Sequence, residues 1–176
     1  KQEKTFFNFI LSPSFRKESD FYDQNEYNSK KEHFEQQVLH ILNILKKNPF
    51  LKEVLTEIDT VGDEREVYRK KHFIEMKAGL RRLQYQGFRI RSHHGETWKI
   101  LRLGVQAVDN ALNIWHIDTL EHGLSLGINP NYYFHRLFQR VIEINQQGKA
   151  LDPGRFEYDE IMDMEWNEHT EVRDKL

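Results

Sequence analysis

The stretch His93-His94-Gly95-Glu96 follows a short apolar run and is one of three polar clusters that decide the fold. The other two are Asp59-Thr60-Val61-Gly62-Asp63-Glu64 upstream and Glu121-His122-Gly123 downstream, and each of them also follows apolar residues. Successive clusters lie about 30 positions apart, which is the length of one strand–helix–strand unit. The spacing therefore predicts that chemically active residues return to one edge of a sheet.

Apolar residues at helical spacing separate the clusters. One predicted helix carries Phe73, Met76, Leu80 and Leu83, and the next carries Leu101, Val105, Val108 and Leu112. Further upstream, Ser29 with Glu32 three residues later predicts a helix cap, and Asn48-Pro49 predicts the end of that helix. Strands are expected at residues 5–11, 51–58 and 114–120, with another beginning at Phe88. Strands that alternate with helices indicate a parallel α/β sheet.

About four strands are too few for a complete (β/α)8 barrel, which needs about 250 residues. We expect residues 1–126 to form central βα units of such a TIM-type barrel, in which the loops after the strands share one edge. The segment after Gly123 is longer than an ordinary βα connection. Residues 127–176 are therefore expected to form a helical insertion and an acidic extension. The last part, 151–176, holds nine acidic and three basic residues, a balance typical of a solvated surface.

Composition excludes several classes of protein. With 38% hydrophobic and 31% charged residues, the chain can bury a core and is not compositionally disordered. The absence of cysteine excludes disulfides and thiolate metal sites. It also excludes the cytidine-deaminase type of zinc site, whose H-x-E half His94-Gly95-Glu96 matches but which needs a cysteine pair. No membrane-length apolar run or secretory leader is found, so a cytoplasmic protein is expected.

The three clusters, in this order and at these intervals, resemble the motifs of the adenosine deaminase superfamily. In that family one strand ends in D-x-x-G-D-E, a second in H-x-G-E and a third in an H-G pair. The resemblance covers about residues 6–126. It implies zinc-dependent hydrolytic deamination of an adenine nucleoside or nucleotide on a barrel.

By position, the resemblance implies a role for each of four residues. His93 corresponds to a zinc ligand, and Glu96 to the carboxylic acid that donates a proton to a purine ring nitrogen. His122 corresponds to the histidine that orients and deprotonates the metal-bound water. The backbone amide of Gly62 corresponds to a contact with another ring nitrogen.

These residue types suit the chemistry that the resemblance implies. Replacing a ring amino group by water at neutral pH requires a hydroxide, and zinc lowers the pKa of bound water to about 7. The ring must accept a proton at the same time, which a carboxyl that stays protonated near neutrality can supply. Asp59 and Asp63 also match the family pattern and are assigned supporting roles.

Two motifs of the family are missing from the chain. Neither its H-x-H metal pair nor its D-D pair occurs in the sequence. Zinc takes three or four protein ligands, so we expect residues 1–176 alone to hold zinc poorly through His93 and to be inactive. His94 stands where family members often have a small residue, and we expect it to be structural.

The long segment after Gly123 is similar to that of large, divergent bacterial members of the family. Some of these, of the RADAR type, act in antiphage defence beside an ATPase and assemble into shells, which implies a homo-oligomer and an ATPase partner protein. The run His122-Gly123-Leu124 followed by Tyr133 also resembles AMP deaminases. Adenosine, AMP, ATP and adenosine in RNA are all open as substrates.

Two other hypotheses stay open from the residues alone. The chain could be part of another metal-dependent hydrolase on the same barrel, acting on an amide or phosphoester through a carboxylated lysine or a second metal. It could also be a non-catalytic barrel segment that serves assembly. In that case other side chains would fill the side of the site formed by Gly62, Glu96 and His122.

Overall fold

The computed structural model describes residues 10–155 and 157–164. At its centre lies a four-stranded parallel sheet with the order β1-β2-β3-β4, so each strand pairs with its neighbours in the sequence. The strands are β1 (Ser14–Arg16), β2 (Glu57–Val61), β3 (Arg89–His94) and β4 (Thr119–His122). The predicted parallel α/β sheet is confirmed.

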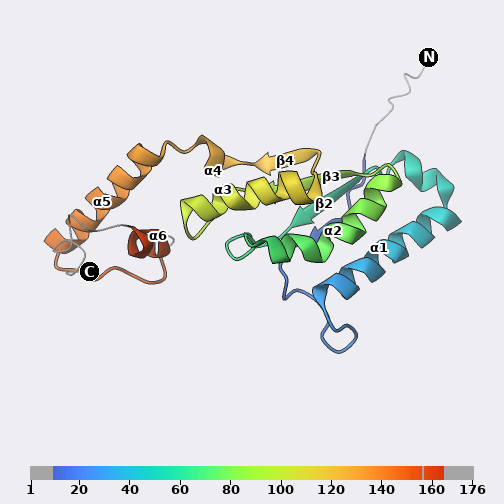
Figure 1. Cartoon of the computed structure of the whole chain (residues 1–176), viewed down its shortest axis with the longest axis horizontal. Helices are drawn as coiled ribbons and strands as arrows, with labels where there is room; N and C mark the ends of the chain where they lie inside the picture. Colours follow the sequence, from blue (N-terminus) through green and yellow to red (C-terminus); the bar gives the residue numbers. More distant parts are fainter. Residues whose placement is uncertain (1–9, 156, 165–176) are drawn as a thin grey trace, which may run out of the picture.

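Three helices connect the strands: α1 (Lys30–Lys47), α2 (Lys70–Tyr85) and α3 (Leu101–Asn110). Crossovers between adjacent parallel strands are almost always right-handed, which places successive helices on the same face of the sheet. Helix α2 packs against α1 on one side and against the turns that follow α3 on the other, and Figure 1 shows the three helices in this succession along the sheet. The main core therefore lies between one face of the sheet and this helical layer.

Alternation along the strands separates two kinds of side chain. Ile58 in β2 and Ile90 in β3 are fully buried on the face that packs against the helices. Residues one position away point to the opposite face, and there Arg91 bonds to Glu57 at 3.1 Å and to Glu121 at 2.6 Å. One face of the sheet is thus apolar and the other is charged.

The bounds of α1 agree with the sequence signals. The Ser29 hydroxyl accepts a hydrogen bond from the Glu32 backbone N–H at 3.2 Å, and the helix ends at Lys47, before Asn48-Pro49. The Glu32 carboxylate accepts a bond from the backbone N–H of Asn28 at 2.9 Å. The predicted cap is therefore confirmed, with the returning carboxylate bonded one residue before the cap residue.

Helix α2 carries the predicted apolar stripe, and all four of its residues are fully buried: Phe73, Met76, Leu80 and Leu83. After the helix ends, the Phe88 N–H donates to the Leu83 carbonyl at 3.1 Å. The chain thereby turns at Gly87 into β3, as predicted. The helix–turn–strand unit that leads to His93 is confirmed.

The first strand differs from the prediction. Residues 5–9 lie outside the described residues, Leu11 is half-exposed and forms an isolated bridge with Leu55, and the strand begins at Ser14. The predicted bounds were wrong because β1 is a short strand at the edge of the sheet, where a proline just before it removes no necessary N–H. The Pro13 carbonyl still accepts a bond from the Asp59 N–H at 3.0 Å.

The region between α3 and β4 also differs. Two of the four residues predicted for the buried stripe, Val105 and Leu112, are 38% and 44% exposed. The helix continues into a π-helical segment, Ala111–Trp115, which turns the fully buried Trp115 inward so that its indole N–H donates to the Phe73 carbonyl at 2.7 Å. Residues 114 and 115 are therefore helical rather than the start of a strand, and β4 begins at Thr119.

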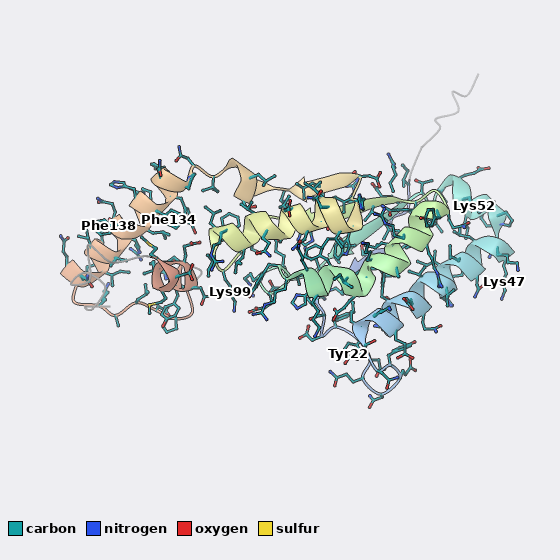
Figure 2. All side chains as sticks on the ribbon, viewed as in Figure 1. Tyr22, Lys47, Lys52, Lys99, Phe134 and Phe138 are labelled. Atoms are coloured by element: carbon teal, nitrogen blue, oxygen red, sulfur yellow. The ribbon has the colours of Figure 1, made fainter. Side chains whose placement is uncertain are left out.

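Helical structure follows β4, as expected for this segment: α4 (Leu124–Gly127), α5 (Pro130–Gln146) and α6 (Tyr158–Asp163). A second group of buried apolar residues lies here: Leu137, Val141, Ile144, Leu151 and Ile161. Figure 1 shows α5 and α6 at the end of the molecule far from α1, and Figure 2 labels Phe134 and Phe138 along α5. In the described part of the chain, no helix combines the length and apolarity needed to cross a membrane.

Candidate functional site

Strand register brings the three sequence clusters to one edge of the sheet. Asp59 in β2 pairs with Arg91 in β3, two residues before His93, and His94 pairs with His122 at the end of β4. In a parallel sheet these positions lie at the carboxyl ends of the strands, where α/β folds place their ligands. The predicted convergence of the loops is therefore seen in the structure.

Four side chains at this edge are joined by two hydrogen bonds and one ion-pair contact, and we call them the His93 cluster: Asp59, His93, Glu96 and His122. Asp59 Oδ2 lies 3.2 Å from His93 Nε2, and His93 Nδ1 lies 3.2 Å from His122 Nε2. Glu96 Oε2 lies 3.4 Å from the same His122 nitrogen. The side chains of His93 and His122 are about one-third exposed and that of Glu96 about half. The cluster is thus ordered and still accessible to a ligand.

His122 is held in an unusual backbone conformation. Its φ of +74° lies in the left-handed region, which costs a residue with a side chain about 1–3 kcal/mol. The following N–H, of Gly123, donates to the His94 carbonyl at 2.9 Å and fixes the turn at the end of β4. The strained backbone and this bond together turn the imidazole back toward His93.

Gly62 lies at the same sheet edge, at the end of β2, but beside Glu18. Its φ is +112°, and a Cβ there would collide with the Glu18 carboxylate. That carboxylate accepts the Asp63 N–H at 2.9 Å and pairs with Arg16 at 2.5 Å. The structure brings His93, Glu96 and His122 together and places Gly62 just after the neighbouring strand β2, against a different acid.

Glu64 is a residue of this edge to which the sequence interpretation gave no role. Its side chain is buried, and its carboxylate accepts hydrogen bonds from three successive backbone N–H groups, of Gly95, Glu96 and Thr97, each at 2.7 Å. Burial alone raises the pKa of Glu64, but the His94 side chain, these N–H groups and the nearby Lys17 outweigh it and lower the pKa to about 2. Its place at the end of the D-x-x-G-D-E motif is the signal that could have identified it.

Lys17 is a second residue of this edge to which the sequence interpretation gave no role, and it has no sequence signal. It follows β1, is buried, and its ammonium donates to the backbone carbonyl of His93. Burial lowers the pKa of Lys17 to about 8, against the opposing effect of Glu64, Glu18 and Asp59. The buried Lys17 ammonium therefore holds the backbone of β3 in place at His93.

His94 points away from the cluster into the core, as expected for a structural residue. Its ring packs on Phe73 and Trp115, with centroids 5.3 and 5.7 Å away, and is fully buried. Its Nδ1 lies 3.5 Å from Glu64 Oε2. Burial lowers the pKa of His94 to about 4, more than the Glu64 carboxylate raises it, so the ring is neutral at pH 7.

The donors at this edge meet the needs of a zinc ion only in part. Asp59 and His93 are of the types that zinc accepts, but a protein zinc site uses three or four ligands. Within residues 10–155 and 157–164, no group of three or more histidine, aspartate or glutamate side chains is arranged to hold a metal ion. The described residues therefore do not form a complete zinc site.

Comparisons of the chain with protein-family models, with curated proteins and with solved structures found no match. What can be argued about function therefore depends on two kinds of observation. One is the geometry of the His93 cluster, and the other is the order and spacing of the three motifs that build it.

Proposed function

We propose that this chain is the central part of a catalytic barrel that deaminates an adenine nucleoside or nucleotide by hydrolysis. The observation that carries the proposal is the meeting of His93, Glu96 and His122 within 3.2–3.4 Å at the carboxyl edge of a parallel sheet. They come from two motif loops separated by a full βα unit. The order of these motifs along the chain resembles that of adenosine deaminases.

The charged face of the sheet favours a closed barrel rather than a doubly wound sheet. When helices cover both faces of a parallel sheet, its strands are apolar on both sides. Here the face opposite the helices carries Arg91 between Glu57 and Glu121, three side chains from three adjacent strands that bond in one layer. In a closed (β/α) barrel the helices cover only the outside, and inward-facing side chains of the strands fill the interior. We therefore propose that this face is the interior of a barrel completed by other strands.

Each residue of the His93 cluster suits a step of proton handling. The Asp59 carboxylate faces His93 Nε2, an arrangement that fixes the tautomer and orientation of an imidazole. His122 Nε2 lies between the second nitrogen of His93 and the Glu96 carboxyl group, so a proton on this nitrogen bridges the two groups. Glu96, the most exposed of the four, can present a proton to a ring nitrogen.

In the family that the motifs resemble, zinc supplies the nucleophile by acidifying water. Because the described residues do not complete a zinc site, the proposal requires further ligands from outside residues 10–155 and 157–164. Without them, we propose that the chain is inactive. The chemistry assigned here is limited to positioning and proton transfer by the His93 cluster.

The test is product analysis with the full-length protein. Inosine-type products and ammonia are measured from adenosine, AMP, ATP and an RNA oligomer, for the wild type and for Glu96→Gln. We expect the wild type to deaminate at least one of the four and Glu96→Gln to lose about 100-fold or more in rate, because the amide has no acidic proton to donate. Zinc content, measured by mass spectrometry, should be unchanged.

Glu66→Gln is the matched control. Glu66 lies on the loop after β2, is exposed and pairs with Lys99, a residue labelled in Figure 2 on the loop before α3. This variant removes a carboxylate near the same edge without touching the His93 cluster, and we expect it to keep wild-type activity. An active Glu96→Gln, or a zinc-loaded wild type that deaminates none of the four substrates, would contradict the proposal.

A further inference from the structure

Each residue from His93 to Thr97, at the end of β3 and in the loop after it, forms at least one hydrogen bond through its backbone. The N–H groups of Gly95, Glu96 and Thr97 all bond to Glu64. On the carbonyl side, His93 accepts from Lys17, His94 accepts from Gly123 N–H at 2.9 Å, and Gly95 accepts from Ser125 N–H at 2.8 Å. The loop that carries Glu96 is therefore tied to three neighbouring segments at once.

Packing leaves this loop little lateral freedom. Gly95 has a φ of +76°, and a Cβ at this position would lie 2.6 Å from the Ser125 hydroxyl and 2.9 Å from a Val108 methyl group. The loop after β4 thus fits closely against one side of the turn. Glu64, from the loop after β2, closes the other side.

Glu64 connects the motif at the end of β2 to the motif at the end of β3. A buried carboxylate that accepts several N–H bonds is a strong acceptor and holds them in a fixed direction. Glu96 is itself one of the three donors, so its backbone position follows the Glu64 carboxylate. Its side chain then reaches to 3.4 Å from His122.

We propose that Glu64 is a positioning residue: by binding three successive N–H groups, its carboxylate sets where the Glu96 side chain stands relative to His122. The geometric part of this inference is independent of the reaction, and its kinetic consequence rests on the deaminase function proposed above. In that reaction, Glu64 contributes to the rate without touching the substrate.

The geometric part is tested first, by backbone hydrogen exchange and by a crystal structure. In the wild type, the amides of residues 95–97 should exchange slowly although Glu96 is exposed. Gly95 N–H bonds to one oxygen of Glu64, and the N–H groups of Glu96 and Thr97 bond to the other. In Glu64→Gln one of these oxygens becomes an NH₂ that faces N–H donors instead of accepting from them, so we expect the amides that bonded to it to exchange about tenfold faster or more. We also expect the Glu96 carboxylate to move about 1 Å or more away from His122. Rapid exchange in the wild type, or an unmoved Glu96 in the variant, would overturn the inference.

Kinetics of the full-length protein separate positioning from a purely structural role. Loss of alignment by about 1 Å lowers kcat by up to about 100-fold with little change of KM. Glu64→Asp keeps the charge on a shorter side chain and should retain more activity than Glu64→Gln, and it replaces that variant if Glu64→Gln does not fold. Equal kcat in both variants and wild type would show that Glu64 is structural alone.

The matched control is Glu157→Gln. Glu157 is as buried as Glu64, but it lies just before α6 and pairs with Arg140 of α5 at 3.8 Å. We expect this variant to leave kcat and the exchange of residues 95–97 unchanged. If the wild type shows no deamination, the proposed function fails, whereas the exchange and crystallographic results still decide whether Glu64 positions Glu96.

Discussion

At the scale of single residues, the tautomers of two imidazoles determine what the His93 cluster can do. If the Asp59 carboxylate accepts the proton on His93 Nε2, then His93 Nδ1 is an acceptor and His122 Nε2 must be a donor. The His122 N–H is then shared between His93 and Glu96, which lie 3.2 and 3.4 Å away. The Asp59 carboxylate, at one end of this chain of bonds, thereby determines that His122 Nε2 carries a proton beside Glu96, at the more exposed end.

Replacing Asp59 with Asn should reverse this order. The amide can donate to His93 Nε2, which moves the imidazole proton to Nδ1 and places two N–H groups against each other at His122. We expect a changed His93 tautomer in ¹⁵N NMR of the imidazoles and a fall in deaminase activity of about 10- to 100-fold. Asp63→Asn is the control: Asp63 belongs to the same motif but pairs with Arg65 at 2.6 Å, so the His93 tautomer should stay as in the wild type. An Asp59→Asn protein with the wild-type tautomer would contradict the assignment.

The same residues show how far the site could be predicted from sequence. The meeting of the clusters that hold His93, Glu96 and His122 was predicted because these clusters follow apolar runs at nearly equal intervals, and interval and topology suffice to bring the ends of parallel strands together. The choice of these three residues within the clusters came from the motif resemblance. Glu64 and Lys17 were given no role because a buried charge is recognised by its tertiary partners. For these two residues the partners are backbone groups of the loop after β3, which have no sequence signature.

At the scale of elements, local signals predicted α1 and α2 well and three strands less well: residues 51–58 were expected as a strand, but Pro49–Glu53 is a 3-10 helix and β2 begins at Glu57. The Ser29 cap bonds to its own helix, and the apolar stripe of α2 is visible as a spacing within a single helix. The nearby sequence is therefore enough to predict both features. By contrast, β1 is short and lies at the edge of the sheet, where neither a long apolar run nor the absence of proline is required. The π-helical segment after α3 is determined by the burial of Trp115 against Phe73, a contact 42 positions apart in the sequence.

The packing of α1 on α2 makes a prediction at this scale. Gly79 faces α1 so closely that a Cβ would lie 2.6 Å from the ring of Phe34 and 3.2 Å from Val38. Gly79→Ala gains about 1 kcal/mol of helix propensity, but the overpacking costs about 1–3 kcal/mol. We therefore expect Gly79→Ala to be less stable than the wild type, or at most equally stable. The free energy of unfolding in urea measures the difference.

Gly127→Ala provides the comparison. Gly127 is the last residue of α4, and a Cβ there meets no atom within 4 Å. The same substitution at this position should leave the free energy of unfolding unchanged or raise it slightly. A Gly79→Ala protein that is more stable than Gly127→Ala would show that α1 and α2 are not packed as described.

At the scale of the whole molecule, one buried carboxylate joins the sheet layer to the C-terminal helices. Glu160 in α6 accepts the N–H of Leu101, the first residue of α3, and the hydroxyl of Tyr133 in α5. The Tyr133 hydroxyl lies 3.4 Å from the indole nitrogen of Trp98, on the loop that also carries Glu96. Helices α5 and α6 are thus connected to the loop of the candidate site through polar contacts as well as by the chain.

This junction should make stability depend on pH. Burial raises the pKa of Glu160 more than its bonds from Leu101 and Tyr133 lower it, so the folded state binds this proton more tightly than the unfolded state does. A group whose pKa is higher in the folded state stabilises the fold below its unfolded pKa, and this stabilisation is lost as the pH rises through the folded pKa. Glu160→Gln stays neutral at every pH and keeps an acceptor oxygen. The stability of this variant minus that of the wild type should therefore be larger at pH 7 than at pH 4.

Denaturant unfolding at the two pH values measures this difference, and the control is Asp163→Asn, which changes an exposed acid of the same helix. If Glu160→Gln loses more stability at pH 7 than at pH 4, the carboxylate at this junction is stabilising in its charged form, and the pKa of Glu160 is lowered rather than raised.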